Sequence, residues 1–135
     1  MGTLSSIKFE GYTAKELLSL PVADFDAYVF SDEALVIEIG SCNLLGKFSA
    51  SEFRLVLELA QIDGGGEGVL PALASLANRV ASARGLSEIE WQIHAVHCAR
   101  PNLKLRRVLE RRGFIVRELP GVGEVYHQVT AVKDQ

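Results

Sequence analysis

The sequence predicts a mixed α/β domain of the α+β kind, with a mostly antiparallel central sheet of about seven strands and about four flanking helices. Short segments in which apolar residues alternate, stripes of helical period, and glycines between the two patterns predict it. The 135 residues are 48% hydrophobic and 23% charged. This composition is ordinary for a globular protein and excludes a disordered chain or a disulfide scaffold. We therefore expect one domain over residues 1–135.

The N-terminal part predicts a strand followed by two short helices. Ile7 and Phe9 alternate with polar neighbours, which is typical of a strand. Thr13 and Glu16 match a capping box, because each side chain can bind a free backbone donor near the other residue. Pro21 ends the helix that they open. A second helix is expected over residues 23–31, where apolar residues recur at spacings of three and four.

An antiparallel meander is expected next, with strands over residues 34–39, 44–49 and 53–62. The last strand alternates strictly, so its two faces differ in character. One face is expected to hold Phe53, Leu55, Leu57 and Leu59. The other is expected to hold Arg54, Val56, Glu58 and Ala60.

The second half alternates helices with strands. A helix over 69–84 ends before Gly85, and a strand follows over 88–96. Asn102 caps the next helix, which Gly113 ends. Two final strands are expected over residues 114–118 and 125–132. The strand–helix–strand step makes strands 53–62 and 88–96 parallel through a right-handed crossover.

The net charge of −3 conceals an uneven distribution. Residues 1–90 have a balance of −7, and residues 91–135 have a balance of +4. Seven of the fourteen basic residues lie between Arg100 and Arg117. This segment could attract a phosphate or form a solvated helix face. Net acidity argues against a nucleic-acid partner.

The termini and cysteines indicate where the protein works. The apolar runs are too short to cross a bilayer, and the first residues lack a signal-peptide pattern. Cys42 and Cys98 are the two cysteines, a usage that fits a reducing compartment. We expect a cytoplasmic protein without membrane association.

A glycine-rich segment over residues 64–68 lies between a strand and a helix. Free N–H groups at a helix start attract phosphate, so the segment is a candidate pyrophosphate site. Neither a Walker loop nor a Rossmann fingerprint is present. A purely structural turn remains the alternative.

Two motifs around this segment resemble those of the GNAT superfamily of N-acyltransferases. Residues 66–73, Gly-Glu-Gly-Val-Leu-Pro-Ala-Leu, resemble the Gly-x-Gly-x-Gly/Ala-x-x-Leu part of its acyl-CoA motif. Residues 102–114 resemble its later Asn-x-x-Ala-x-x-x-Tyr-x-x-x-Gly-Phe motif, with Asn102, Gly113 and Phe114 in register. The predicted element order also matches the family's fold.

The resemblance implies a sheet that splays open between strands 53–62 and 88–96, with acetyl-CoA or another acyl-CoA in the cleft. Backbone amides around Gly66, Gly68 and Leu70 would bind its pyrophosphate. The pantetheine would pair with backbone near Leu59 to Gln61, and Asn102 would face the same arm. The implied activity is transfer of an acyl group, acetyl being the first candidate, to the amine of an acceptor that the resemblance does not identify. No metal is implied.

Candidate catalytic groups follow from the chemistry of acyl transfer, which requires a base and an acid. Glu58 is the candidate base, because it lies near the end of the central strand, where some members of the family that the chain resembles keep a base. A solvated strand position is its alternative. Tyr126 is the candidate acid, and packing against the sheet is its alternative. Alternation places His94 and His97 on opposite faces, which argues against a shared metal. Cys98 is expected to be either a reactive thiol or a packed side chain.

The chain departs from the family pattern at several positions. Asp63-Gly64-Gly65 replaces the usual Gln or Arg at the head of the glycine motif, and Glu67 adds a negative charge. Leu70 stands at the third small position, and Leu109 stands where a tyrosine often acts as the acid. These departures leave a second hypothesis open, a catalytically inactive binding or assembly module of the same fold. A homodimer is also left open.

Overall fold

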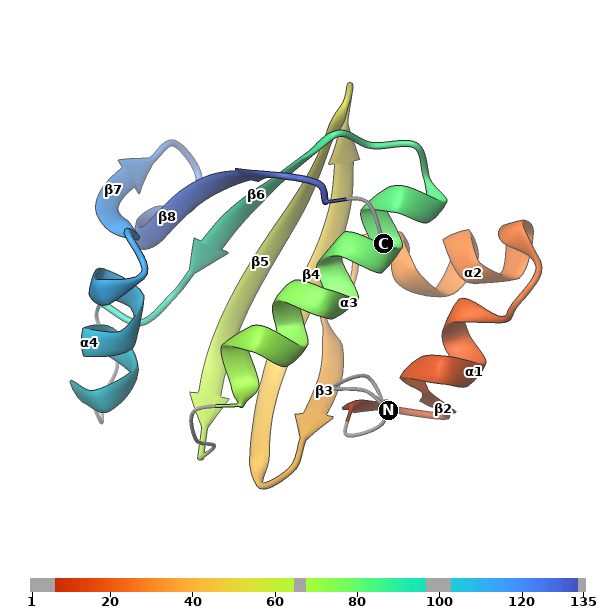
Figure 1. Cartoon of the computed structure of the whole chain (residues 1–135), viewed down its shortest axis with the longest axis horizontal. Coiled ribbons are helices and arrows are strands. Elements are labelled where there is room, and N and C mark those ends of the chain that lie inside the picture. Colours follow the sequence, from red (N-terminus) through yellow and green to blue (C-terminus); the bar gives the residue numbers. More distant parts are fainter. Residues whose placement is uncertain (1–6, 65–67, 97–102, 134–135) are drawn as a thin grey trace.

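A computed structural model describes residues 7–64, 68–96 and 103–133. Eight strands and four helices occur in these ranges (Figure 1). The strands are β1 (Ile7–Phe9), β2 (Tyr12–Thr13), β3 (Leu35–Ile39), β4 (Cys42–Ser51), β5 (Arg54–Asp63), β6 (Glu88–Ile93), β7 (Ile115–Leu119) and β8 (Gly123–Ala131). The helices are α1 (Ala14–Leu18), α2 (Val22–Val29), α3 (Val69–Ala83) and α4 (Leu103–Arg111).

All eight strands form one sheet in the order β2-β1-β3-β4-β5-β6-β8-β7. Strands β5 and β6 pair in parallel, and the other neighbours in this order are antiparallel. The predicted mixed, mostly antiparallel sheet with four helices is therefore confirmed. The eighth strand, the two-residue β2, was too short to produce a sequence pattern.

Local sequence explains where the elements begin and end. Thr13 and Glu16 form the expected capping box, with backbone N–H groups donating to Glu16 Oε1 at 2.9 Å and Thr13 Oγ1 at 3.1 Å. Glu52 adopts a positive φ of 55° in the tight turn between β4 and β5. Phe53 belongs to this turn and is 49% exposed, so the strand begins one residue later than expected, at Arg54.

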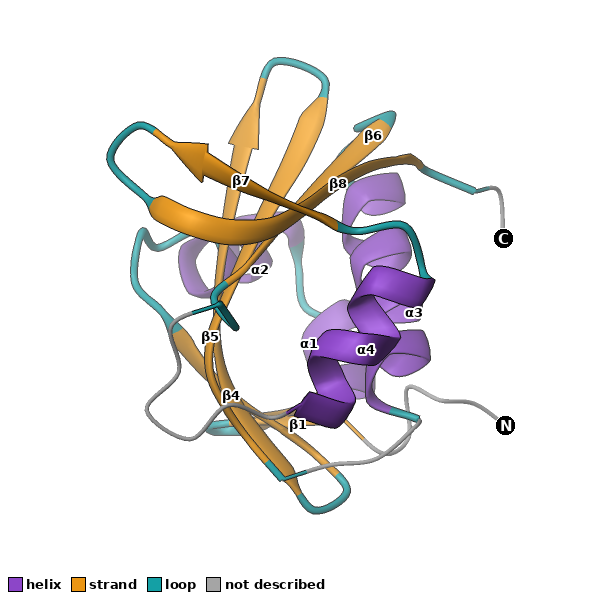
Figure 2. Cartoon of the chain, turned by 90° about the vertical axis from the view of Figure 1, so that its left-hand side faces the viewer, coloured by secondary structure: helices purple, strands orange, loops and turns teal. Residues whose placement is uncertain are grey.

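The core lies on one face of the sheet, beneath the helices. Leu55, Leu57 and Leu59 are fully buried there, as expected from the alternation in β5. Figure 2 shows α3 and α4 on the same side of β5. Helix α2 is joined to the C-terminal end of α3 by a 2.7 Å ion pair between Arg84 and Asp26.

The two faces of the sheet can be assigned from register, because directly paired residues point to the same side. The helix face carries Leu59, Ile93 and Tyr126, which are mutual partners across β5, β6 and β8. The open face carries Glu58 and its partners in the next strands, Gln92 and then His127. No helix among the described residues is long and apolar enough to cross a membrane.

Candidate active site at the opening between β5 and β6

The parallel strands β5 and β6 separate after Leu59 and Ile93, their last paired residues. One further hydrogen bond, 2.8 Å from the His94 N–H to the Leu59 carbonyl oxygen, closes the pairing. Strand β5 continues to Asp63 beside β4, whereas the chain turns away after β6. The sheet therefore opens here, as the splayed fold class requires.

A bulge bends β5 where it runs beyond β6. Leu45 pairs with Ala60 but Asn43 pairs with Asp63, so β5 has one residue more than β4 across this stretch. Within the bulge Gln61 adopts a φ of 51°, which is uncommon for a residue other than glycine. The bulge therefore directs the end of β5 away from the line of β6.

Gly64 fixes the chain immediately after β5. Its φ is 79°, and a Cβ at this position would lie 2.6 Å from the Ser41 carbonyl oxygen. A side chain would collide with backbone that has no freedom to rotate away, so glycine is required. This contact holds the start of the glycine-rich segment against the β3–β4 turn.

Glu58 and His94 meet on the open face beside the opening. Glu58 Oε2 lies 2.6 Å from His94 Nε2, and the two side chains are about one-third exposed, at 33% and 31%. Glu58 was expected near the end of its strand. In the structure it lies in the middle of β5, next to Leu59, the last residue of β5 that pairs with β6. The arrangement joins a carboxylate and an imidazole, the two groups most used in proton transfer.

The Glu58–His94 pair was not predicted, because its partners are 36 residues apart in the sequence. Alternation along β6 puts His94 on the same face as Gln92. Which residue of β5 lies beside His94 depends on the register between the two strands, and that register brings Glu58 there. His97 and Cys98 lie outside the described residues.

Tyr126 lies on the helix face and is fully buried. Its hydroxyl donates to Glu110 Oε2 at 2.9 Å and accepts from Arg106 Nε at 3.1 Å, both on α4. Its strand neighbour Ile93 marks the end of the β5–β6 pairing. The two candidate catalytic residues therefore approach the opening from opposite faces of the sheet.

The expected cofactor-binding residues are only partly described. Gly66 and Asn102 lie outside the described residues. The Leu59 carbonyl already accepts from His94, so the β5 backbone without a β6 partner in the described structure begins at Ala60. Gln61 is exposed within that stretch.

Helix α3 begins at Val69, shortly after β5 ends at Asp63. Gly68 is its N-cap and makes no side-chain capping bond. A Cβ on Gly68 would meet no atom within 4 Å, so its backbone can be approached closely. Leu70 is 8% exposed, and its side chain packs into the core rather than over the helix start. The N-terminal end of α3 thus offers backbone donors to an anion.

A second polar network occupies the open face nearer the other end of β6. Glu90 accepts from Gln92 at 2.8 Å, from His127 at 3.1 Å and from Arg54 at 3.2 Å. Arg54 also binds Glu88 at 2.8 Å. Burial raises the pKa of Glu90, but the hydrogen bonds from Gln92, His127 and Arg54 outweigh it and hold the pKa below its ordinary value. This network keeps Glu90 ionised within the sheet.

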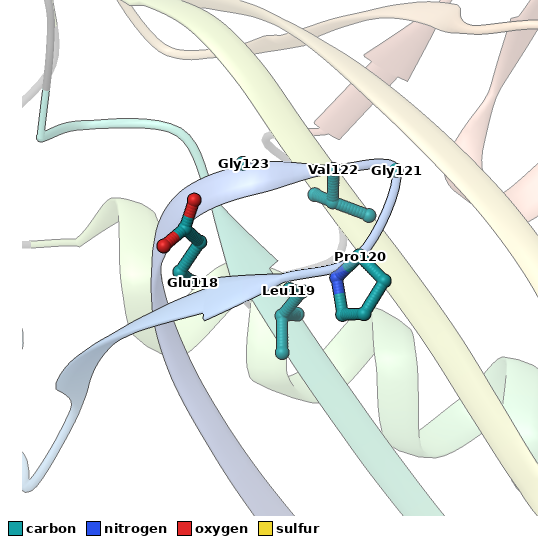
Figure 3. A pocket seen from close by; sticks show the side chains of 6 residues that line it. All are labelled: Glu118, Leu119, Pro120, Gly121, Val122 and Gly123. Carbon is teal, nitrogen blue, oxygen red and sulfur yellow. The ribbon is translucent and has the colours of Figure 1, made fainter.

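Two other features, a hollow at the β7–β8 turn and the Cys42 thiol, offer fewer reactive groups. The β7–β8 turn forms a hollow of about 520 Å³. Figure 3 shows the described residues that line it, among which Glu118 has the one ionisable side chain. Cys42 is buried, and burial followed by the nearby Asp63 charge raises the pKa of its thiol. Within the described ranges, no cluster of three or more His, Cys, Asp or Glu residues could hold a metal ion.

Comparison with known proteins gives matches among solved structures alone. No family model and no curated protein matches the chain. One similar structure is Ard1 from Thermoplasma volcanium, at 12% identity and a TM-score of 0.49, with 96% of this chain and 99% of that chain covered. Another is a proposed acetyltransferase from Agrobacterium tumefaciens, at 16% identity and a TM-score of 0.37, with 87% and 90% covered.

Proposed function

We propose that this protein is an acyl-CoA-dependent N-acyltransferase, with acetyl-CoA as the acyl donor and an amine as the acceptor. The observation that carries the proposal is the Glu58–His94 pair at the point where β5 and β6 part. By the GNAT resemblance of residues 66–73 and 102–114, the thioester of the donor would lie at this same opening. The pair would therefore lie where an amine must lose a proton.

Glu58 acts as the base in this proposal, and His94 holds its carboxylate in position. The proton leaves the amine nitrogen for Glu58 Oε1 or Oε2, and the nitrogen forms its bond to the thioester carbonyl carbon as the C–S bond breaks. A side chain one-third exposed is accessible to an acceptor that approaches over the open face. The short contact with His94 restricts the carboxylate to one orientation.

Tyr126 is the proposed acid for the leaving thiolate. It lies on the helix face beside Ile93, across the sheet from Glu58. Its hydrogen points to Glu110, so the hydroxyl must rotate to give its proton to sulfur. Arg106, which donates to the same oxygen, would stabilise the phenolate that remains.

The proposed donor site combines β5 backbone with the start of α3. The backbone of Ala60 to Asp63 would pair with the pantetheine arm, and amides from Gly68 to Leu70 would bind the pyrophosphate. By resemblance, Gly66 and Asn102 complete the site. The absence of a side-chain cap at Gly68 and the inward turn of Leu70 support this assignment, because neither blocks the helix start.

The first test is calorimetric titration with acetyl-CoA, followed by thiol release in the presence of amino acids, polyamines and lysine peptides. We expect saturable binding, and Glu58→Gln should lower turnover by about 10² to 10⁴ while leaving affinity nearly unchanged. Glu38→Gln, at an exposed position of β3, is the matched control and should retain full activity. A Glu58→Gln variant with an unaltered rate would remove Glu58 from the mechanism.

One observation favours a second candidate, an inactive binding module of the same fold. Leu109 stands where the resemblance places a catalytic tyrosine, and it is fully buried in the core. Failure to bind acetyl-CoA at millimolar concentration would exclude the enzyme and leave this module.

A further inference from the structure

A groove of about 250 Å³ lies on the helix face between α3 and the β6–β8 strands. The described residues that line it are Leu70, Ala74, Asn78, Trp91, Arg112, Phe114, Gln128, Thr130, Ala131 and Lys133. We propose that this groove is a binding site, separate from the acyl-transfer site, for a small ligand with an apolar body and a carboxylate.

The floor of the groove is apolar and well ordered by packing. Trp91 and Phe114 are 5% and 7% exposed and pack edge to face, with ring centroids 6.4 Å apart. Leu70 and Ala74 stand one helical turn apart on α3 and form the facing wall. An aromatic edge beside aliphatic side chains favours a ring or a short hydrocarbon chain.

Charge at the rim is of one sign. Arg112 and Lys133 are both exposed cations that line the groove, and none of its described lining residues is acidic. The chain as a whole is acidic, with a net charge of −3, so the rim of the groove has the opposite sign of charge to the whole protein. Two cations beside an apolar floor match an anionic head on an apolar body.

Hydrogen bonds from polar side chains hold the segments around the groove in position and leave its opening unobstructed. Asn78 Oδ1 accepts from the Lys133 N–H at 2.9 Å, which holds the C-terminal segment against α3. Gln128 Nε2 donates to the Arg112 carbonyl at 2.9 Å and so holds the end of α4. Thr130 Oγ1 accepts from Trp91 Nε1 at 3.3 Å, and its own hydrogen remains for a ligand oxygen. The backbone at each of the two cationic residues is thereby fixed within the fold.

The groove lies on the opposite face of the sheet from the proposed base and its partner. Among its described lining residues, Leu70 alone also belongs to the proposed donor site, where its backbone amide is used. Trp91 pairs with Gln128, which places both on the helix face, whereas Glu58 and His94 lie on the other face. Its volume is below the roughly 300–1,000 Å³ of pockets that hold drug-sized ligands. The volume limits the proposed carboxylate ligand to a single ring or a chain of similar size.

The test uses 4-phenylbutyrate as the probe and 4-phenylbutyramide as its uncharged counterpart. Trp91 is the one tryptophan of the chain, so its fluorescence reports on the groove directly. We expect a saturable fluorescence change with the acid, and at least about tenfold weaker binding of the amide, since the charge interaction is lost. Ala74→Leu should reduce binding by filling the groove, with folding checked by circular dichroism.

Lys133→Ala and Arg112→Ala should each weaken binding of the acid several-fold and leave the amide unaffected. Arg117→Ala, an exposed cation of β7 outside the groove, is the matched control. Equal affinity for acid and amide, or no saturation at millimolar acid, would overturn the proposal. Displacement by acetyl-CoA would also overturn it, because the groove would then belong to the donor site. Failure to bind acetyl-CoA would leave this proposal intact.

Discussion

The helix face and the open face of the sheet use the same strands for different purposes. On the helix face Leu57 is fully buried and belongs to the continuous core. On the open face its neighbours Val56 and Glu58 are partly exposed, and Glu58 binds His94. A strand with alternating side chains can thus anchor the fold with one set of residues and hold ionisable groups with the other. Substitution at one face should therefore affect stability, and at the other face chemistry.

The largest expected effect compares two adjacent residues of β5. Leu57→Ala should lower the free energy of unfolding by roughly 2–5 kcal/mol, because it removes buried methyl groups and leaves a cavity. Val56→Ala should cost less than about 1 kcal/mol, since its side chain is partly in water. Urea unfolding measures both. Equal losses would show that the open face is covered in solution, for example by a second copy of the chain.

A smaller effect should come from Glu90 on the open face, and it should depend on pH. Its pKa is lowered in the folded protein, so its bonds stabilise the fold above the unfolded-state pKa of about 4.3. This stabilisation is lost as the pH falls through the folded-state value. Glu90→Gln should therefore cost roughly 1–3 kcal/mol at neutral pH and progressively less below about pH 4.

Urea unfolding of the wild type and of Glu90→Gln, from neutral pH to below about pH 4, measures the difference in their free energies of unfolding. Glu118→Gln, on the exposed edge strand β7, is the control and should show a small, constant difference. A deficit of Glu90→Gln that persisted at low pH would mean that shape rather than charge holds this network together.

The smallest effect should come from the bulge that separates the two strands. Gln61 has a positive φ, so Gln61→Gly removes strain and should raise the free energy of unfolding by at most about 1 kcal/mol. Ala60→Gly, one residue earlier and without positive φ, should instead destabilise by roughly 0.5–1 kcal/mol. Thermal unfolding separates the two. A destabilising Gln61→Gly would show that the glutamine side chain, not the backbone, maintains the bulge.

The sequence was sufficient for most of the fold because the local patterns agree with the tertiary structure. The capping box at Thr13 and the alternation of Leu55, Leu57 and Leu59 each depend on neighbouring residues, and both are confirmed. The misplaced Phe53 shows the limit, since a tight turn took the first residue of the expected strand.

The site was less predictable, because its geometry depends on register between distant segments. Glu58 was a candidate from its position, but the contact with His94 follows from how β5 lies beside β6. The separation of Glu58 and Tyr126 onto opposite faces has the same origin. The bulge at Gln61 arises from one unmatched residue between β4 and β5, for which the sequence carries no turn motif.

The parallel pairing of β5 and β6 also divides the molecule into two mechanical halves. The antiparallel strands β1–β5 form one half, and β6, β8 and β7 form the other. The seam between the halves is the one parallel pairing among the described strands, and parallel pairing is slightly less stable per residue than antiparallel pairing. Partial unfolding should therefore begin by opening the seam, with exchange of the His94 amide as its earliest sign. A molecule bound where β5 and β6 part would resist that opening, so its binding would protect the whole sheet against proteolysis.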